Sequence, residues 1–357
     1  MASNVYFVRA NRTETAKAIA GKALSLFRKA DLGTAIGKND LVAVKIHFGE
    51  GKNDTHISPE YAKPVIGEIR KLGGNPFWTE TCVLYKSDRD NAVNHLRLAR
   101  EHGFTIDKTG APVVIADGLV GSEEREVPIP GKIFDKVSIA GAAVEANAMV
   151  VLTHVTGHMA TGIGGAIKNI GMGLASRKGK LRQHSAMKPT ISEKQCTACE
   201  VCIRWCPEDA IAMKGKAAWI NPEACIGCGE CITVCRFDAV KHDWGAEEGE
   251  LQRKMAEHAL GVVIGKPGKV AYMNFVMGVT KDCDCMGFKQ KPVLEDIGIL
   301  AGTDPVAMDA ASLDLIERHA GKTLTDLSYP GLDPWEQIRH GETIGLGSRK
   351  YQMIETP

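Results

Sequence analysis

The 357-residue sequence lacks the long apolar runs of membrane-spanning segments. No stretch approaches the roughly 18 uninterrupted apolar residues of a transmembrane helix. Residues 1–9 contain no basic segment followed by an apolar run, so no secretory signal peptide is predicted. Excess charge is also missing, because 44 basic residues face 43 acidic ones and the net charge is +1. A chain without a dominant charge is not expected to bind nucleic acid or an anionic membrane.

Aromatic residues are scarce at 6%, but the chain is 44% hydrophobic and 24% charged, which is typical of soluble globular proteins. Its length gives room for two or three domains. Cysteine is abundant instead: there are eleven, an odd number, and free thiols are typical of a reducing compartment. We therefore expect a cytoplasmic protein, and an anaerobic setting if its thiols bind iron.

Eight of the cysteines form two copies of one spacing. Each copy reads Cys-x2-Cys-x2-Cys-x3-Cys, in which three thiolates bind one iron–sulfur cubane and the fourth reaches the neighbouring cluster. Zinc sites instead use two Cys-x2-Cys pairs separated by a longer stretch. The sequence therefore predicts two [4Fe-4S] clusters with crossed ligands. The expected ligands are Cys196, Cys199, Cys202 and Cys235 for one cluster, and Cys225, Cys228, Cys231 and Cys206 for the other. This segment resembles the bacterial two-cluster ferredoxins, which implies electron transfer with a redox partner protein.

Strands and helices alternate along the rest of the chain. The nearly continuous apolar run at 41–46 is typical of a parallel strand buried on both faces. The alternation predicts an α/β fold with a mostly parallel sheet and helices on both faces. Further strands are expected at 5–8, 75–79, 112–116, 148–153 and 270–276, and helices at 13–29, 58–72, 88–101, 247–263 and 305–319.

The cysteine segment interrupts this alternation. We expect residues 1–189 to form the first part of an α/β body, residues 190–244 a small two-cluster ferredoxin-like insert, and residues 245–357 the second part of the body. A surface loop can host such an insert because the ends of a compact module lie close together. Two independent α/β domains joined by the cysteine segment are the alternative layout.

Residues 154–169 and their neighbours supply the main candidate pocket. They follow a predicted strand, and α/β sheets bind ligands at strand ends. Three glycines at a helix start, followed by Lys168, predict a cradle for an anionic small molecule or a nucleotide-like cofactor, although no Walker or GxGxxG motif is complete. The alternative is a tight glycine turn with surface histidines. The candidates are Lys168, His158 and His184 for catalysis, and Gly162, Gly164, Gly165, His154 and His47 for cofactor binding.

Cys283 and Cys285 form a second unusual feature. In an extended segment their side chains share a face, so both thiols could bind one soft metal or flank a cofactor. Two packed core cysteines are another interpretation. A redox-active pair is a third, although a disulfide between residues so close is strained. Non-catalytic positions are expected for Cys82 as a structural residue, Asp304 as a helix cap, and His242 and His258 as solvated side chains.

Four stretches resemble the domain of unknown function 362 family. They are Val-Lys-Ile-His at 44–47, Gly-Gly-x-x-Lys-Asn at 164–169, Cys-Asp-Cys at 283–285 and the run at 296–309. The resemblance covers nearly the whole chain and implies the fold more than the chemistry. A more distant similarity is to the nickel-pincer lactate racemase family, in which His158, Lys168 and His184 would match residues around a covalently held nickel-pincer nucleotide. That similarity implies a ligand pocket here.

Three functions fit these features. The first is a redox enzyme or electron-transfer subunit whose clusters relay electrons between a partner protein and the pocket, which then holds a substrate or a second metal or nucleotide-like cofactor. The second is a ferredoxin-bearing docking or accessory protein without its own catalysis. The third, a racemase-like isomerase, leaves the clusters without a role and ranks last.

Overall fold

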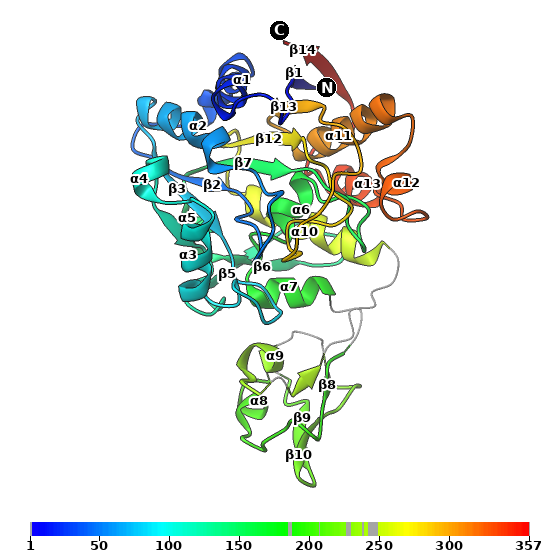
Figure 1. Cartoon of the computed structure of the whole chain (residues 1–357). Coiled ribbons are helices and arrows are strands. Elements are labelled where there is room, and N and C mark those ends of the chain that lie inside the picture. The colour runs from blue at the N-terminus through cyan, green and yellow to red at the C-terminus, as the bar shows by residue number, and fades with distance from the viewer. Residues whose placement is uncertain are drawn as a thin grey trace.

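The computed structural model describes residues 2–184, 188–206, 208–225, 230–237, 239–241 and 249–356. Its largest element is an eight-stranded sheet in the order β14-β1-β13-β12-β7-β2-β3-β4 (Figure 1). The strands are β1 (Ser3–Arg9), β2 (Leu41–Lys45), β3 (Asn75–Glu80), β4 (Val113–Ile115), β7 (Ala148–His154), β12 (Val270–Val276), β13 (Gly298–Gly302) and β14 (Tyr351–Glu355).

The sheet is mostly parallel, as predicted. Strands β12, β7, β2, β3 and β4 run parallel to one another, and so do β1 and β14. Only β13, among the strands of this sheet, pairs antiparallel with both of its neighbours. Every residue of the central strand β7 is buried. A strand that is paired on both edges and covered on both faces reads as one apolar run, which explains the pattern at 148–153.

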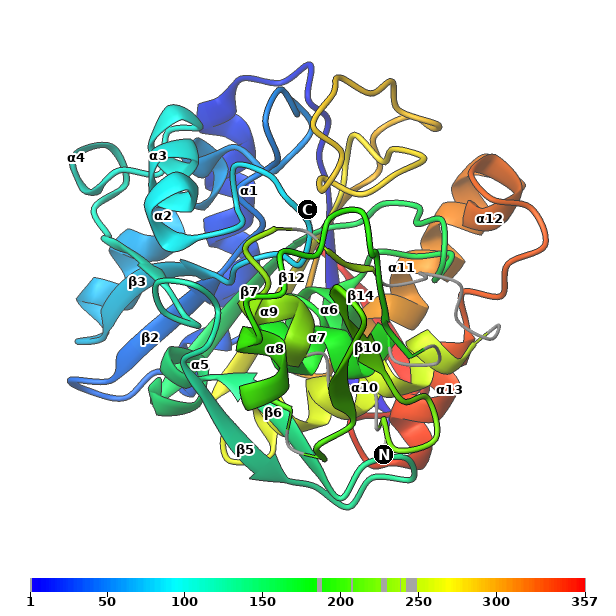
Figure 2. The ribbon, with the colours of Figure 1, turned by 90° about the horizontal axis from the view of Figure 1, so that it is seen from below.

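Helices cover both faces of the sheet (Figures 1 and 2). On one face, α1 (Ala16–Lys29) and α2 (Pro59–Lys71) bury Ile19, Phe27, Val65 and Ile69 in one hydrophobic cluster. On the other, α6 (Ala166–Gly171), α10 (Glu250–Val263) and α11 (Pro305–Ala320) bury Ile167, Ala259 and Val306 in a second cluster. The sheet therefore separates two cores, and the predicted α/β class is confirmed.

Side-chain caps set where several helices begin. Thr15 accepts a hydrogen bond from the Ala18 N–H, so α1 begins at Ala16 and not at 13. Asn91 caps α3 (Ala92–Glu101) in the same way. The Asp304 carboxylate accepts from two N–H groups at the start of α11, which confirms its predicted role as a cap.

Short or polar elements escaped the sequence prediction. They are the 3-10 helix Leu32–Ala35, α4 (Ile106–Thr109), the hairpin of β5 (Glu124–Pro128) and β6 (Lys136–Ala140), α5 (Gly141–Glu145), α7 (Arg177–His184), α12 (Leu324–Leu327), α13 (Glu336–Thr343), and strands β13 and β14. Helix α7 shows the reason. Its sequence is almost entirely polar, yet Gly179, Lys180, Leu181 and Gln183 are buried, so no apolar period marks it.

The cysteine segment forms small elements of its own. Strand β8 (Thr190–Ile191) pairs with β11 (Val240–Lys241), and β9 (Ile211–Lys214) pairs with β10 (Ala217–Ile220). The helices are α8 (Val201–Arg204) and α9 (Glu230–Val234). Because β8 opens the segment and β11 closes it, their pairing brings its two ends together. Figure 1 shows these elements beneath the large sheet, with α9 nearest to α7.

One predicted position is wrong. His258 was expected to be solvated, but its side chain is fully buried, and Nδ1 lies 2.8 Å from the Lys254 carbonyl oxygen. Helix α10 is enclosed on nearly every side, so its polar residues are buried along with its apolar ones. His242 lies outside the described residues. None of the described helices has the length and apolar character needed to cross a membrane.

Candidate functional site

Seven of the eight predicted cluster ligands lie in described residues, and Cys228 does not. Burial raises the pKa of the Cys202 thiol, and Cys196, Cys199 and Cys235 raise it further through their charges. The fold thus places Cys235, the last cysteine of the second motif, beside the first three of the first motif. These four are the set that the crossed pattern assigns to one cluster.

The surroundings of these sulfurs fit iron–sulfur ligation. The Ala210 N–H donates to Cys206 Sγ at 3.2 Å, and the Ala218 N–H donates to Cys196 Sγ at 3.5 Å. Hydrogen bonds from backbone N–H groups to the sulfurs help set a cluster's reduction potential. Among the described residues, no three His, Cys, Asp or Glu side chains converge on one metal ion. The cluster prediction therefore continues to rest on the spacing of the cysteines.

A cavity of about 500 Å³ lies at the carboxyl ends of three parallel strands. Lys45 ends β2, Glu80 ends β3 and His154 ends β7, and all three line it. This is the edge at which α/β sheets bind ligands. We call it the strand-end pocket. Of the residues predicted from the sequence, it is lined by His47, His154, His158, Gly164, Gly165, Lys168, His184, Cys283 and Cys285. Gly162 is not among its lining residues.

The predicted anion cradle at the glycines is wrong. The first N–H groups of α6 do not face the pocket, because the Ala166 and Ile167 N–H groups donate to the carboxylate of buried Asp309, at 2.6 and 2.9 Å. A Cβ on Gly165 would lie 2.4 Å from that carboxylate, so this position needs glycine for close approach. Gly164 instead pairs through its backbone with Thr156. These glycines shape the wall, and the cations of the pocket come from side chains.

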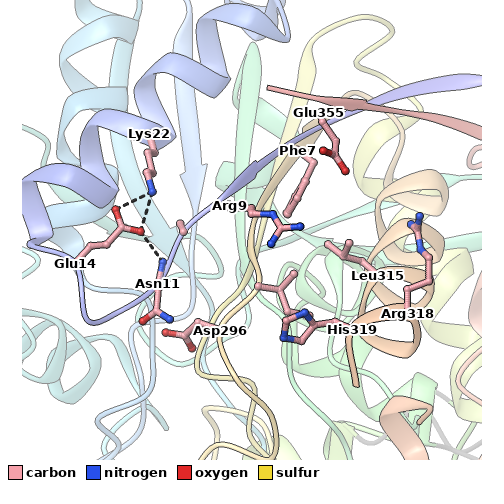
Figure 3. A pocket seen from close by; sticks show the side chains of 12 residues that line it. Phe7, Arg9, Asn11, Glu14, Lys22, Asp296, Leu315, Arg318, His319 and Glu355 are labelled. Atoms are coloured by element: carbon pink, nitrogen blue, oxygen red, sulfur yellow. Dashed lines mark hydrogen bonds and ion pairs between the residues drawn. The ribbon is translucent and has the colours of Figure 1, made fainter. Parts of the chain in front are cut away.

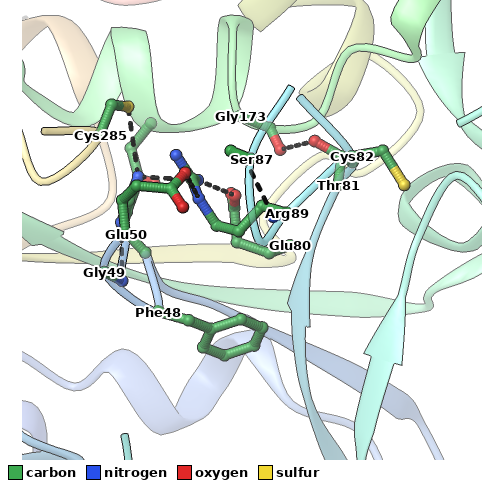
Figure 4. Close-up of polar contacts among 12 residues, drawn as sticks. Phe48, Gly49, Glu50, Glu80, Thr81, Cys82, Ser87, Arg89, Gly173 and Cys285 are labelled. Atoms are coloured by element: carbon green, nitrogen blue, oxygen red, sulfur yellow. Dashed lines mark hydrogen bonds and ion pairs between the residues drawn. The ribbon is translucent and has the colours of Figure 1, made fainter. Parts of the chain in front are cut away.

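An ionic network that the sequence analysis missed forms one wall (Figure 4). Arg89 is almost fully buried; its Nε lies 2.9 Å from Glu50 Oε2 and its Nη1 3.3 Å from Glu80 Oε2. Lys45 also pairs with Glu80. Burial alone would raise the pKa of Glu80, but Lys45, His47 and Arg89 lower it to about 2. Arg89 lies in a loop without any periodic pattern, so nothing in the sequence marked it.

His47 connects this network to the cysteine pair. Its Nε2 lies 3.3 Å from Cys285 Sγ and 3.0 Å from Arg89 Nη1, while the Gly49 N–H donates to Nδ1 at 2.9 Å. Nδ1 accepts the Gly49 hydrogen bond, so Nε2 is the nitrogen that faces both the Cys285 sulfur and the Arg89 N–H donor. The Arg89 guanidinium thereby brings a positive charge close to the Cys285 sulfur.

Asp284, between the two cysteines, anchors their segment. Its Oδ2 lies 2.8 Å from His154 Nδ1, and its Oδ1 accepts from the Thr55 hydroxyl at 2.9 Å. His154 Nε2 lies 3.0 Å from the Met277 carbonyl oxygen, so both ring nitrogens face acceptors and the imidazole is a cation. Burial opposes that charge, but Asp284 raises the pKa of His154 above its usual value. His154 therefore holds protein residues in place, whereas the sequence predicted a cofactor contact.

Lys168 and the cysteine pair determine each other's charge. Burial lowers the Lys168 pKa, but the sulfurs of Cys283 and Cys285 outweigh it and raise that pKa overall. The Cys283 thiol donates a hydrogen bond to Cys285, which raises the pKa of Cys283 and lowers that of Cys285 well below the usual range. His47 and Lys168 lower the pKa of Cys285 further. Both shifts favour negative charge on the Cys285 sulfur over negative charge on the Cys283 sulfur.

His158 is neutral at physiological pH. Burial lowers its pKa to about 3, and the Lys168 charge acts in the same direction. The Ala160 N–H donates to Nδ1 at 3.2 Å, so Nε2 carries the proton. His158 can therefore donate a hydrogen bond into the pocket, and its predicted catalytic role stays a prediction. His184 lies at the end of α7 and lines the same pocket.

A second cavity, of about 370 Å³, lies between β1, α1 and α11 (Figure 3). Its polar side chains include Arg9, Arg318 and His319. Glu14, on its wall, is already paired with Lys22 at 2.7 Å. No cysteine lines this cavity, and the network of buried charges that marks the strand-end pocket is missing from its lining residues.

Comparisons with known proteins match two parts of the chain. The family model described as "Domain of unknown function (DUF362)" matches residues 42–314. Pyruvate synthase subunit PorD of Methanothermobacter marburgensis is 33% identical over 79 residues, which are 22% of this chain and 90% of PorD. Indolepyruvate oxidoreductase subunit IorA of Pyrococcus abyssi is 38% identical over 79 residues. That match covers 21% of this chain and 12% of IorA, so the chain spans only a small part of that relative. Among solved structures, the lactate racemase apoprotein of Thermoanaerobacterium thermosaccharolyticum aligns at a TM-score of 0.46 and 13% identity, over 88% of this chain and 57% of that one.

Proposed function

Because the chain belongs to the domain of unknown function 362 family and also matches a protein named ferredoxin, from Mycobacterium tuberculosis, at 35% identity over 57 residues, we propose that it is an iron–sulfur redox protein whose two [4Fe-4S] clusters exchange electrons with a ligand in the strand-end pocket. The clusters would be held by the eight cysteines at 196–235 and would supply one-electron transfer. The chain's own residues would bind the ligand and set its charge.

The observation that carries this proposal is that residues of the α/β body close to both ends of the cysteine segment line the pocket. His184, the last residue of α7 before the segment, lines the pocket. Leu251 and Met255, in the first turns of α10 after the segment, line it too. Helix α7 also lies beside α9, which contains the cluster ligand Cys231. Described residues of the α/β body that precede and follow the cysteine segment therefore line the pocket, which favours a short path for electrons.

The charges in the pocket favour an anionic ligand. Arg89 and Lys45 are paired with Glu50 and Glu80, and His154 with Asp284. Lys168 has no carboxylate or hydrogen-bond partner within the described part of the chain, and it lines the pocket. An uncompensated buried cation is unfavourable without an anion nearby. The cysteine thiolate supplies part of that compensation, and a bound anion would supply the rest.

Electron transfer into the pocket can be tested with a tethered acceptor. Met159 lines the pocket with half of its surface exposed, so a Met159→Cys variant can be labelled with a flavin maleimide. Cys283→Ser and Cys285→Ser in the same chain direct the label to the new thiol. After anaerobic reduction of the clusters, the flavin should be reduced in a first-order step whose rate does not depend on protein concentration.

The matched control carries the flavin at Glu355→Cys, on β14 at the far end of the sheet from the cysteine segment (Figure 1). There, reduction should occur mainly between molecules and should accelerate with protein concentration. Concentration-dependent reduction at both positions would contradict the proposal. It would favour the alternative of a docking subunit, which the names of the relatives PorD and IorA, both subunits, bring into consideration.

A further inference from the structure

We propose that Cys283 and Cys285 are a redox-active thiol pair that reduces a small anionic disulfide bound in the strand-end pocket. The inference names the substrate class of the proposed function, and it rests on that function for the electrons that restore the thiols. The nucleophile is the Cys285 sulfur, and Cys283 supplies the second thiol.

The geometry of the segment places both sulfurs at the same cavity. Cys283 and Cys285 both line the pocket, whereas Asp284 between them is fixed by His154 and Thr55. Residues 283–286 form a turn and not the extended segment considered from the sequence, because the Met286 N–H donates to the Cys283 carbonyl oxygen at 3.1 Å. The turn keeps the two cysteines close together. A Cβ on Gly164 would lie 3.9 Å from the Cys283 Cβ, so the opposite wall packs close to the pair. The two thiols therefore lie close together at the cavity, with Cys285 the more exposed of the two.

Positive charge surrounds one of the two sulfurs. His47 Nε2 lies 3.3 Å from Cys285 Sγ, and Arg89 Nη1 lies 3.0 Å from that same nitrogen. Lys168, which faces the same cavity, adds its ammonium charge, and together these groups lower the pKa of Cys285. Reactive cysteines occur in such electropositive, partly accessible surroundings.

Cys82 shows the contrasting environment in the same chain. It is fully buried, its N–H donates to the Asp117 carboxylate, and burial together with that carboxylate raises the pKa of its thiol. A buried cysteine beside a negative charge is inert. The two environments separate a structural cysteine from a reactive one, and Cys82 provides an internal control.

The reaction balances in two exchange steps. The Cys285 thiolate attacks one sulfur of the substrate disulfide, which forms a mixed disulfide and releases one substrate thiolate. Cys283 then loses its proton and attacks Cys285 Sγ, which closes the Cys283–Cys285 disulfide and releases the second substrate thiolate. Two electrons pass from the cysteine pair to the substrate. Two one-electron transfers from the proposed clusters, with uptake of protons, would restore the thiols.

The spacing of the pair suits turnover. A disulfide between residues i and i+2 is strained, and strained disulfides have higher reduction potentials and are easily reduced. Such a pair does not remain trapped in the oxidised state. The cavity of about 500 Å³ admits a small molecule, and Lys168 favours carboxylates on it.

The first test measures thiol reactivity in anaerobically purified holoprotein. Trypsin releases Cys283 and Cys285 in the peptide 282–289, separate from Cys82 and from the cluster cysteines. An ordinary thiol with a pKa near 8.5 is only about 1% thiolate at pH 6.5. Iodoacetamide at that pH should therefore modify Cys285 up to about a hundredfold faster than an ordinary thiol, and faster still relative to Cys82. Equal rates for Cys285 and Cys82 would overturn the proposal.

A pair of lysine variants tests the role of the surrounding charge. Lys168→Met should slow the alkylation of Cys285 and shift its pH profile to higher pH. The control is Lys281→Met, in the same loop, because the Lys281 ammonium lies over the Tyr329 ring, 4.6 Å from its centroid. That control should leave the rate unchanged, and trypsin then releases the pair in the peptide 270–289. Iron content and circular dichroism confirm that both variants fold. If both substitutions slow the reaction equally, the assigned role of Lys168 is wrong.

The second test uses two disulfide probes of opposite charge. Glutathione disulfide is anionic and cystamine is cationic. Glutathione disulfide should convert peptide 282–289 from the dithiol to the internal disulfide faster than cystamine does, as detected by mass spectrometry without reducing agent. Cys283→Ser should stop the reaction at the mixed disulfide with Cys285. A dithiol that resists both probes would overturn the proposal.

Failure of the pair and failure of the proposed function give different results. Both thiol tests run with oxidised clusters, so they do not depend on electron transfer within the protein. If the internal disulfide forms but reduced clusters do not restore the thiols, the thiol chemistry stands and the cluster relay fails. If the tethered flavin is reduced but the pair does not react, the relay stands and this inference fails.

Discussion

His154 Nδ1 lies 2.8 Å from Asp284 Oδ2, so a buried cation at the end of β7 holds the residue between the two pocket cysteines. The pair joins the central strand of the sheet to a loop 130 residues further along the chain. It is the main polar link between the rigid fold and the cysteine pair, with Thr55 as the second anchor.

Replacing His154 by Gln should destabilise the protein by about 3–5 kcal/mol, because it leaves the Asp284 carboxylate buried without its cation. The folded-state pKa of Asp284 is lowered, so the contribution of Asp284 to the free energy of unfolding is lost as the pH falls below about 4. The folded-state pKa of His154 is raised, so the contribution of His154 to the free energy of unfolding is complete below about pH 6.5, its unfolded-state pKa. That contribution is lost as the pH rises through the folded-state pKa. The stability difference should therefore be largest between those limits.

Anaerobic urea denaturation of wild type and variant from pH 4 to 9 measures this difference. Thr55→Val is the matched control, because it removes the hydrogen bond to the other Asp284 oxygen without removing a charge. It should cost about 1.5–3 kcal/mol, with little dependence on pH above about 5, where Asp284 is ionised in both the folded and the unfolded chain. A difference for His154→Gln that grows as pH rises would contradict the ion-pair assignment.

Acid should destabilise the fold through its buried neutral histidines. Burial lowers the pKa of His258 to about 3, below the unfolded value near 6.5. Between these two pKa values the unfolded chain binds more protons than the folded chain. The contribution of His258 to the free energy of unfolding is therefore complete above about pH 6.5. It falls by up to about 1.4 kcal/mol per pH unit as the pH drops towards 3. His258→Phe, which keeps a ring against Phe134, should flatten the loss of stability between pH 6.5 and 4. An unchanged slope would show that His258 becomes protonated without unfolding.

Much of the fold and part of the site were predictable from local patterns. The buried strands, the helix caps and the spacing of the cluster cysteines depend on neighbouring residues, so the α/β class and the resemblances to family 362 and to ferredoxins were recognised and are confirmed. The strand-end rule also located the pocket. The chemistry of the pocket depends on contacts between residues that are far apart in the sequence. The Asp309 carboxylate accepts a hydrogen bond from the Ala166 N–H at the start of α6, although the two residues are 143 positions apart in the sequence. Glu50 and Glu80 form ion pairs with Arg89, which lies in a loop that no sequence pattern marks.

The cluster content gives a direct test of the crossed ligand pattern. Anaerobically reconstituted protein should contain eight irons and eight acid-labile sulfides per chain. Cys206→Ser should damage the second cluster more than the first, although Cys206 belongs to the first motif. Iron analysis and electron paramagnetic resonance of the reduced protein distinguish the two clusters. About four irons in fully reconstituted wild type would contradict the two-cluster prediction.

The cysteine segment should be removable. Strands β8 and β11 pair at its two ends, so a short Gly/Ser linker in place of residues 190–244 can close the gap. We expect a soluble α/β body that unfolds cooperatively in urea, with the alkylation of Cys285 preserved. A matched deletion variant replaces the same residues by a longer linker of the same composition, which should behave alike because loop length costs little stability. Aggregation of both deletion variants would mean that the segment is part of the body's core.

The last prediction concerns ligand retention by Lys168 and His158. Lys168→Ala removes the cation that has no carboxylate partner among the described residues. Protein purified anaerobically should therefore lose any anionic small molecule that wild type retains, with unchanged iron content and circular dichroism.

His158 is neutral at all pH values well above 3, so His158→Gln, which keeps an N–H donor, should retain more ligand than His158→Ala. For the same reason, protonation of His158 should not alter retention between pH 5 and 8 in wild type. Mass spectrometry of the denatured samples measures the ligand, with Lys281→Ala as the control outside the pocket. Identical small molecules in all variants, together with identical rates of cluster reoxidation, would rule out a ligand-binding redox pocket and leave the docking protein.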